Sequence, residues 1–171
     1  DFVASGEAVF AAADIARSAA GWDATLGERA QTDPTIAVQI AWDIGRRADH
    51  TVGVALASDD QEHWHVIDFD RFVRVPFPEI AERIATMSHR YPQADVRVES
   101  NGIGDPLIEG LLQVPVEPFT TTARSKVQAL QAIQLLLEQG TLHIPVEDVP
   151  ALVEELQVYE WDDKHLRQDA V

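Results

Sequence analysis

The sequence predicts an α/β fold with a mixed central sheet of five or more strands, flanked by helices. Three extended segments separated by short turns predict an antiparallel meander at the start of this sheet. After the meander, extended segments alternate with helical stripes, which predicts parallel strands joined by crossovers. The length of 171 residues and the 46% of hydrophobic residues suffice for one sizeable core and exclude intrinsic disorder.

The extended segments are rich in β-forming residues and end at turn residues or acids. The segment TIAVQIAW ends at Asp43, and the short segment VRV ends at Glu99. The turns DHT and SDDQ separate the first three segments and are short enough for hairpins. The predicted strands, in chain order, are residues 35–42, 50–57, 62–69, 96–98, 114–119 and 141–144.

Helices are predicted by apolar residues that recur every three or four positions. Such stripes run from Ile80 to Tyr91 and from Val127 to Leu137. Asp105 before Pro106 predicts the start of a shorter helix, and Asp148 with Pro150 predicts the start of another. Residues 1–18 are expected to be helical or partly ordered, and the composition of residues 19–34 predicts a connector.

The first predicted strand and the strand ending at Glu99 are expected to be parallel, so that their carboxyl ends lie at one edge of the sheet. Asp43 and Glu99 then face each other as two like charges, which favours an intervening proton or cation. Carboxylate oxygens suit Mg²⁺ or Mn²⁺ better than zinc. Two such ions about 4 Å apart activate water and stabilise the leaving oxygen in phosphodiester hydrolysis. Position alone leaves open that each acid ends a strand in solvent.

The balance of charge is strongly acidic, with 13 basic and 29 acidic residues and a net charge of −16. A chain so poor in Lys and Arg is not expected to bind phosphates tightly. Clustered carboxylates are tolerated when they bind divalent cations, and a host rich in salt is the other explanation. Part of the charge is therefore interpreted as a metal site.

The lack of cysteine and of a long apolar run excludes several classes of protein. There is no cysteine, so the sequence holds no disulfide, no thiolate metal site and no cysteine nucleophile. No apolar run approaches the ~20 residues of a membrane-spanning helix. The chain opens with Asp1 instead of Met, so we expect it to be a piece of a longer protein.

Three motifs in order give the sequence a family resemblance. WDIGRRADHTVGVAL, VESNGIGDPL and HLRQDAV resemble the nuclease domain of the large terminase subunit, the genome-packaging motor of tailed double-stranded DNA viruses. TTARSKVQALQAIQLLLEQGTLHIP resembles that family's lysine-headed helix and short strand, and DFVASGEAVF resembles the tail of the preceding ATPase domain. The resemblance implies an RNase H-like nuclease domain over residues 34–171 and a connector from an ATPase domain over residues 1–33.

The resemblance also implies the site residues. Asp43, Glu99 and Asp169 match the catalytic carboxylates that hold two divalent cations, Mg²⁺ or Mn²⁺. Gln168 replaces the first acid of the family's late pair, which leaves Asp169 as the match. Asp49 matches a further metal-binding acid, although a role as a turn residue is an equal interpretation.

Contacts to DNA phosphates are expected from four basic residues, Arg46, Arg47, Arg124 and Lys126. The implied function is a metal-dependent endonuclease that cleaves concatemeric viral double-stranded DNA during packaging, in the host cytoplasm. The portal and the small terminase subunit are the implied partners of the full-length motor, and no membrane is involved. No G-x-x-x-x-G-K-[ST] loop is present, so ATP hydrolysis is not expected.

Other functions are consistent with part of these sequence features. A junction resolvase or another RNase H-like nuclease shares the fold, and a non-catalytic acidic module that docks onto the motor shares the charge. DIGRRADHTVGVAL also resembles the first phosphate loop of actin-like ATPases and sugar kinases, which need a second glycine-rich loop and a two-lobed body. His63 and His65 form a possible zinc pair, but without a third ligand at suitable spacing they are better explained as exposed strand residues.

Overall fold

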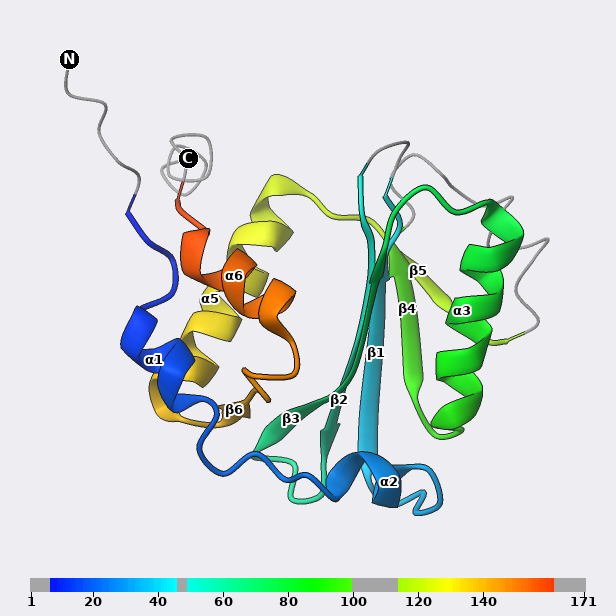
Figure 1. Cartoon of the computed structure of the whole chain (residues 1–171), viewed down its shortest axis with the longest axis horizontal. Helices are drawn as coiled ribbons and strands as arrows, with labels where there is room; N and C mark the ends of the chain where they lie inside the picture. Colours follow the sequence, from blue (N-terminus) through cyan, green and yellow to red (C-terminus); the bar gives the residue numbers. More distant parts are fainter. Residues whose placement is uncertain (1–6, 46–48, 100–113, 162–171) are drawn as a thin grey trace. The chain divides into compact units, whose positions relative to one another are not determined.

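The computed structural model describes residues 7–45, 49–99 and 114–161 of the chain (Figure 1). The chain divides into two compact units. One unit comprises residues 1–22 and 121–171, and the other comprises residues 23–120. The second unit contains the candidate site and most of the sheet.

The 23–120 unit is built on a mixed sheet with the strand order β5-β4-β1-β2-β3. The strands β1, β2 and β3 form an antiparallel meander, whereas β4 pairs in parallel with both β1 and β5. Both features confirm the predicted topology. The strands are β1 (Ala37–Asp43), β2 (Thr51–Ser58), β3 (Trp64–Phe72), β4 (Asp95–Glu99) and β5 (Glu117–Phe119).

Helix α3 (Phe77–Arg90) covers one face of this sheet (Figure 1). Its apolar stripe, which the spacing of Ile80, Ile84 and Met87 predicts, packs into the core against alternate residues of β1 and β4. At the centre of that core lies Trp42, which is fully buried. The facing position on β2 is Gly53, where a Cβ atom would lie 2.6 Å from the indole ring. The core therefore requires glycine at this position.

Salt bridges on the same face tie α3 to β3. Arg83 Nη1 lies 3.1 Å from Asp70 Oδ1, and Arg90 pairs with Asp68. The hydroxyl of Tyr91 also contacts Asp68, and burial raises the pKa of Tyr91 to about 12. The acids that point towards α3 are thus matched by basic side chains.

Helix α2 (Leu26–Ala30) lies inside the stretch that the composition predicts to be a connector. Its Leu26 and Ala30 are completely buried in the core of the 23–120 unit. Gln93 donates hydrogen bonds to the carbonyl oxygens of Ala30 and Ile36, which fixes the chain after the helix. A helix of five residues is too short to show an apolar stripe, so the sequence pattern misses it. The boundary at residues 33 and 34 stays a prediction.

The described part of the other unit is mainly helical. Helix α5 begins with a capping box between Thr122 and Ser125 and ends at Gly140, whose φ of 71° is left-handed. Helix α6 begins at Pro150, with Val149 and not Asp148 at the N-cap. The elements are α1 (Ala12–Arg17), α5 (Ala123–Gln139), β6 (Leu142–His143) and α6 (Pro150–Val158). The helix predicted after Asp105 lies outside the described residues.

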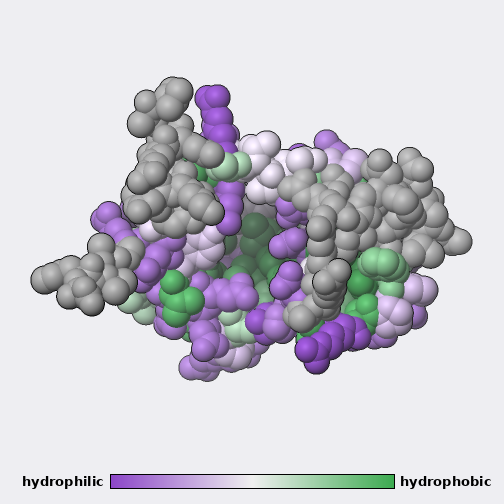
Figure 2. Space-filling model, turned by 90° about the horizontal axis from the view of Figure 1, so that it is seen from above, coloured by the Kyte–Doolittle hydropathy of each residue, from purple (hydrophilic) through white to green (hydrophobic). Residues whose placement is uncertain are grey.

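The surface is rich in hydrophilic side chains, as the share of charged residues predicts. Figure 2 shows that hydrophilic side chains make up most of the described surface on that side of the molecule, as expected for a chain with 25% charged residues. None of the helices in the described ranges has the length and apolar character needed to cross a bilayer.

We predict that Leu26→Ala destabilises the protein by about 2–5 kcal/mol, because it empties a fully buried position. The matched control is Leu135→Ala on α5, where the wild-type side chain is 52% exposed and the loss should be below about 0.5 kcal/mol. Urea unfolding followed by circular dichroism measures both. Equal losses in the two variants would show that α2 does not belong to the core.

Candidate metal centre at the carboxyl edge of the sheet

The parallel pairing of β1 with β4 brings Asp43 beside Glu99. The register runs from Gln39 opposite Asp95 to Trp42 opposite Val98, and the two acids occupy the next position on each strand. Neighbouring strands lie about 4.8 Å apart, and side chains at paired positions point to the same face. The convergence of the two acids that the sequence predicts is therefore present in the backbone.

The two acids lie on the face of the sheet opposite to α3. Trp42 and Val98, which precede them, are buried in the core beneath α3, and side chains alternate along a strand. Gln39 Nε2 donates to Asp95 Oδ2 at 3.2 Å, so paired positions do meet on this second face. Asp43 is exposed and Glu99 is half-buried.

We call this second surface of β1, β4 and β5 the site face. Its side chains form three rows across the strands, because the register of β1, β4 and β5 is continuous. The rows are Gln39–Asp95, Ala41–Arg97–Glu117 and Asp43–Glu99–Phe119.

The backbone of residues 49–50 packs closely against Gly45, two residues after Asp43. A Cβ atom at this position would lie 2.4 Å from the backbone oxygen of Asp49 and 2.5 Å from that of His50. The Gly45 N–H donates to Thr51 Oγ1 at 3.0 Å, and Thr51 is buried. The chain on both sides of the turn is thus fixed next to Asp43.

Thr51 is a residue that the sequence analysis misses. Its role depends on the contact between the start of β2 and the end of β1, which a sequence pattern does not show. Asp49 is exposed in the same turn, one residue before His50 and at the same edge of the sheet as Asp43. The role of Asp49 stays a prediction.

Of the other predicted site residues, three lie outside the described residues and two lie in the other unit. Arg46, Arg47 and Asp169 lie outside the described residues. Arg124 and Lys126 lie in the first turn of α5, in the other unit, and both are exposed. The ammonium of Lys126 lies 5.8 Å from the ring centre of Tyr159.

The donor set at the edge fits a hard divalent cation. Asp43 and Glu99 supply only oxygen atoms, which is the chemistry that Mg²⁺ and Mn²⁺ prefer. Within residues 7–45, 49–99 and 114–161, no group of three His, Cys, Asp or Glu side chains is close enough to hold a metal. Asp169, the third predicted ligand, lies outside these ranges.

The histidine pair does not form an exposed zinc site. His65 is buried on β3, and its Nδ1 accepts the N–H of Asp23 at 3.2 Å. The expectation of exposed strand histidines is wrong for this residue, because a bulge opposite Ala55 and Leu56 shifts the alternation of β3.

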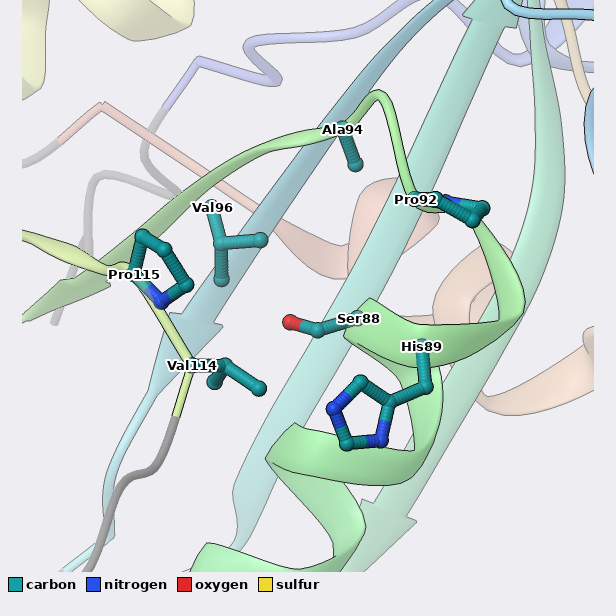
Figure 3. A pocket seen from close by; sticks show the side chains of 7 residues that line it. All are labelled: Ser88, His89, Pro92, Ala94, Val96, Val114 and Pro115. Atoms are coloured by element: carbon teal, nitrogen blue, oxygen red, sulfur yellow. The ribbon is translucent and has the colours of Figure 1, made fainter.

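A pocket of about 270 Å³ lies in the 23–120 unit, away from the acids (Figure 3). It is formed by the end of α3, the chain leading into β4 and Val114, and the hydroxyl of Ser88 points into it. The Ser88 oxygen is buried without a hydrogen-bond partner. Its lining contains no carboxylate, so it does not suit metal-assisted hydrolysis. The seven lining residues are Ser88, His89, Pro92, Ala94, Val96, Val114 and Pro115.

The fold and the two strand-end acids define an RNase H-like α/β domain. The profile of the family described as "Terminase RNaseH-like domain" matches residues 40–171. The chain belongs to this family, which confirms the resemblance and the predicted fold class. A comparison with curated proteins gives no significant match.

Solved structures with the same fold come from several phages. The large terminase nuclease from thermophilic phage G20c with bound magnesium is 21% identical, with a TM-score of 0.63 over 76% of this chain and 68% of that chain. The g2p (large terminase) nuclease domain from bacteriophage SPP1 with bound Mn is 16% identical, with a TM-score of 0.59 over 93% and 80%. The HK97 bacteriophage large terminase is 13% identical, with a TM-score of 0.67, and the match covers 88% of this chain but 36% of that chain.

We predict that Thr51→Val destabilises the protein by about 1–3 kcal/mol, because the Gly45 N–H loses its buried acceptor while the shape of the side chain is kept. Thr51→Ser retains the hydroxyl and serves as the matched control. Amide hydrogen exchange at Gly45 should become faster in the valine variant alone. Unchanged exchange at Gly45 would show that the bond does not hold this turn.

Proposed function

We propose that this chain is a metal-dependent endonuclease domain that cleaves concatemeric viral double-stranded DNA during genome packaging. The observation that carries the proposal is the placement of Asp43 beside Glu99 at one edge of the sheet, in a chain of the terminase RNaseH-like domain family. The SPP1 nuclease domain was solved with bound Mn, and the G20c nuclease with bound magnesium, which supports divalent cations here.

In this proposal Asp43, Glu99 and Asp169 hold two divalent cations, Mg²⁺ or Mn²⁺, with Asp49 assisting. When bound, such cations supply a nucleophilic water and stabilise the leaving 3′ oxygen of the phosphodiester. The protein supplies carboxylate oxygens at fixed positions, because Asp43 and Glu99 end hydrogen-bonded strands and the Gly45–Thr51 bond fixes the turn beside them.

The duplex is held through its phosphates, for which Arg46, Arg47, Arg124 and Lys126 are the proposed contacts. Residues 1–33 are proposed to connect the nuclease domain, residues 34–171, to an ATPase domain. The portal and the small terminase subunit are the proposed partners, and the host cytoplasm the proposed location. The match to 36% of the HK97 large terminase supports a place within a longer protein.

We predict that Asp43→Asn and Glu99→Gln each reduce Mn²⁺-dependent nicking of plasmid DNA to background, because each removes one charged metal ligand. The matched control is Asp95→Asn, which removes an exposed acid from the site face two rows away and should retain activity. Addition of EDTA should stop cleavage by the wild type.

The stability of these variants separates a site role from misfolding. The unfolding midpoint of Asp43→Asn and Glu99→Gln should be unchanged or higher, because the repulsion between two neighbouring carboxylates is relieved. Retained cleavage in a folded variant, with contaminating nuclease excluded, would remove that residue from the mechanism. If the wild type itself does not cleave, a docking module of the packaging motor becomes the better interpretation.

We also predict that the 171-residue chain binds duplex DNA weakly and loses binding quickly as salt is added, because its net charge is −16 and its phosphate contacts are few. Fluorescence anisotropy of a labelled duplex over a series of KCl concentrations measures this. Tight binding that salt does not weaken would contradict the proposed phosphate contacts.

A further inference from the structure

We infer that Arg97 is a phosphate-binding residue, which contacts the backbone of the DNA strand that lies over Asp43 and Glu99. The inference rests on the proposed nuclease function and adds a residue to that site. The ligand group is a phosphodiester, and the binding group is the guanidinium of Arg97.

The position of Arg97 on β4 points to this role. Arg97 lies two residues before Glu99 and therefore on the same face of the sheet, about 6.6 Å along the strand. Its neighbour on β1 in the same row is Ala41, which carries no polar or charged group. The long side chain of Arg97 therefore lies next to the row that holds Asp43 and Glu99.

The guanidinium of Arg97 is accessible. Its side chain is 57% exposed, and its Nε forms an ion pair with Glu117 Oε2 at 3.8 Å, which is longer than a hydrogen bond. Glu117 is itself 73% exposed, so the pair contributes little to stability. The contact with Glu117 leaves the two terminal nitrogens of the guanidinium for a ligand.

Other arginines of the same unit are engaged differently. Arg83 and Arg90 bind Asp70 and Asp68 on the α3 face, and Arg29 Nη2 lies 2.8 Å from Asp23 Oδ2. Those contacts lie within hydrogen-bond distance and tie elements of the fold together. The weak pairing of Arg97 is therefore not the pattern of a structural arginine in this protein.

A positive charge beside the two carboxylates would offset their repulsion of a DNA phosphate. Two carboxylates at the end of β1 and β4 repel a phosphate, and the net charge of −16 adds to that repulsion. A guanidinium presents a planar fork that matches two phosphate oxygens. Arg97 thus supplies positive charge one row from the acids, where the scissile strand would approach.

The test compares Arg97→Gln with Glu117→Gln in the 171-residue chain. Both substitutions break the same ion pair, but only the first removes the cation. Binding of a short labelled duplex is measured by anisotropy over a series of KCl concentrations, with Ca²⁺ in place of Mn²⁺. We expect Arg97→Gln to weaken binding about tenfold at low salt and to reduce the log–log salt slope by about 1. Glu117→Gln should bind with an unchanged slope and equal or greater affinity, and Arg97→Lys should retain the slope.

A second measurement separates this inference from the proposed function. Titration with Mn²⁺ should show that Arg97→Gln binds the metal at least as tightly as the wild type, because a positive charge next to the acids is removed. An unchanged salt slope in Arg97→Gln, an equal effect of Glu117→Gln, or a wild type that does not bind the duplex would overturn the inference. If Arg97→Gln behaves as expected while Asp43→Asn still cleaves DNA, the proposed metal site is wrong but the phosphate contact stands.

Discussion

The in-register parallel pairing of β1 with β4 is the constraint on which the candidate site depends. Trp42 and Val98 are paired across these strands and are buried under α3, so the core fixes the register. A slip of one residue would turn every side chain of one strand to the other face and expose the tryptophan. The acids that follow, Asp43 and Glu99, are held together on the opposite face as a consequence. The energy that brings two like charges together therefore comes from apolar burial at the preceding positions.

The acidic residues on the two faces of this sheet have different surroundings. On the α3 face, Asp68 and Asp70 accept contacts from Arg90 and Arg83, and these pairs join strand to helix. On the site face, the row of Asp43 and Glu99 ends two parallel strands at an edge, where α/β sheets place their ligands. A turn closed by Gly45 and Thr51 then holds the chain next to the first of these acids. The same kind of side chain thus joins strand to helix on one face and, in the proposed function, binds a metal ion on the other.

Much of the fold could be predicted from the sequence, because alternation and helical stripes report directly which face of an element is buried. These patterns identified the meander, α3, α5 and the strand ends at Asp43 and Glu99. Helix α2 was missed because five residues show no period, and His65 was misplaced because a bulge changes the alternation of β3. Thr51 and Arg97 could not be identified because their roles depend on contacts made in the folded chain. Thr51 accepts a hydrogen bond from Gly45, and Arg97 lies one row from Asp43 and Glu99 on the sheet. The placement of Asp169 stays a prediction, as it lies outside the described residues.

A crystal structure of the chain with bound Mn²⁺, located by its anomalous signal, would show whether Asp43 and Glu99 share a metal ion. We predict a Mn²⁺ ion coordinated by oxygen atoms of both Asp43 and Glu99, on the face of the sheet opposite to α3. An ion bound by neither residue, or two carboxylates that point to opposite faces of the sheet, would contradict it.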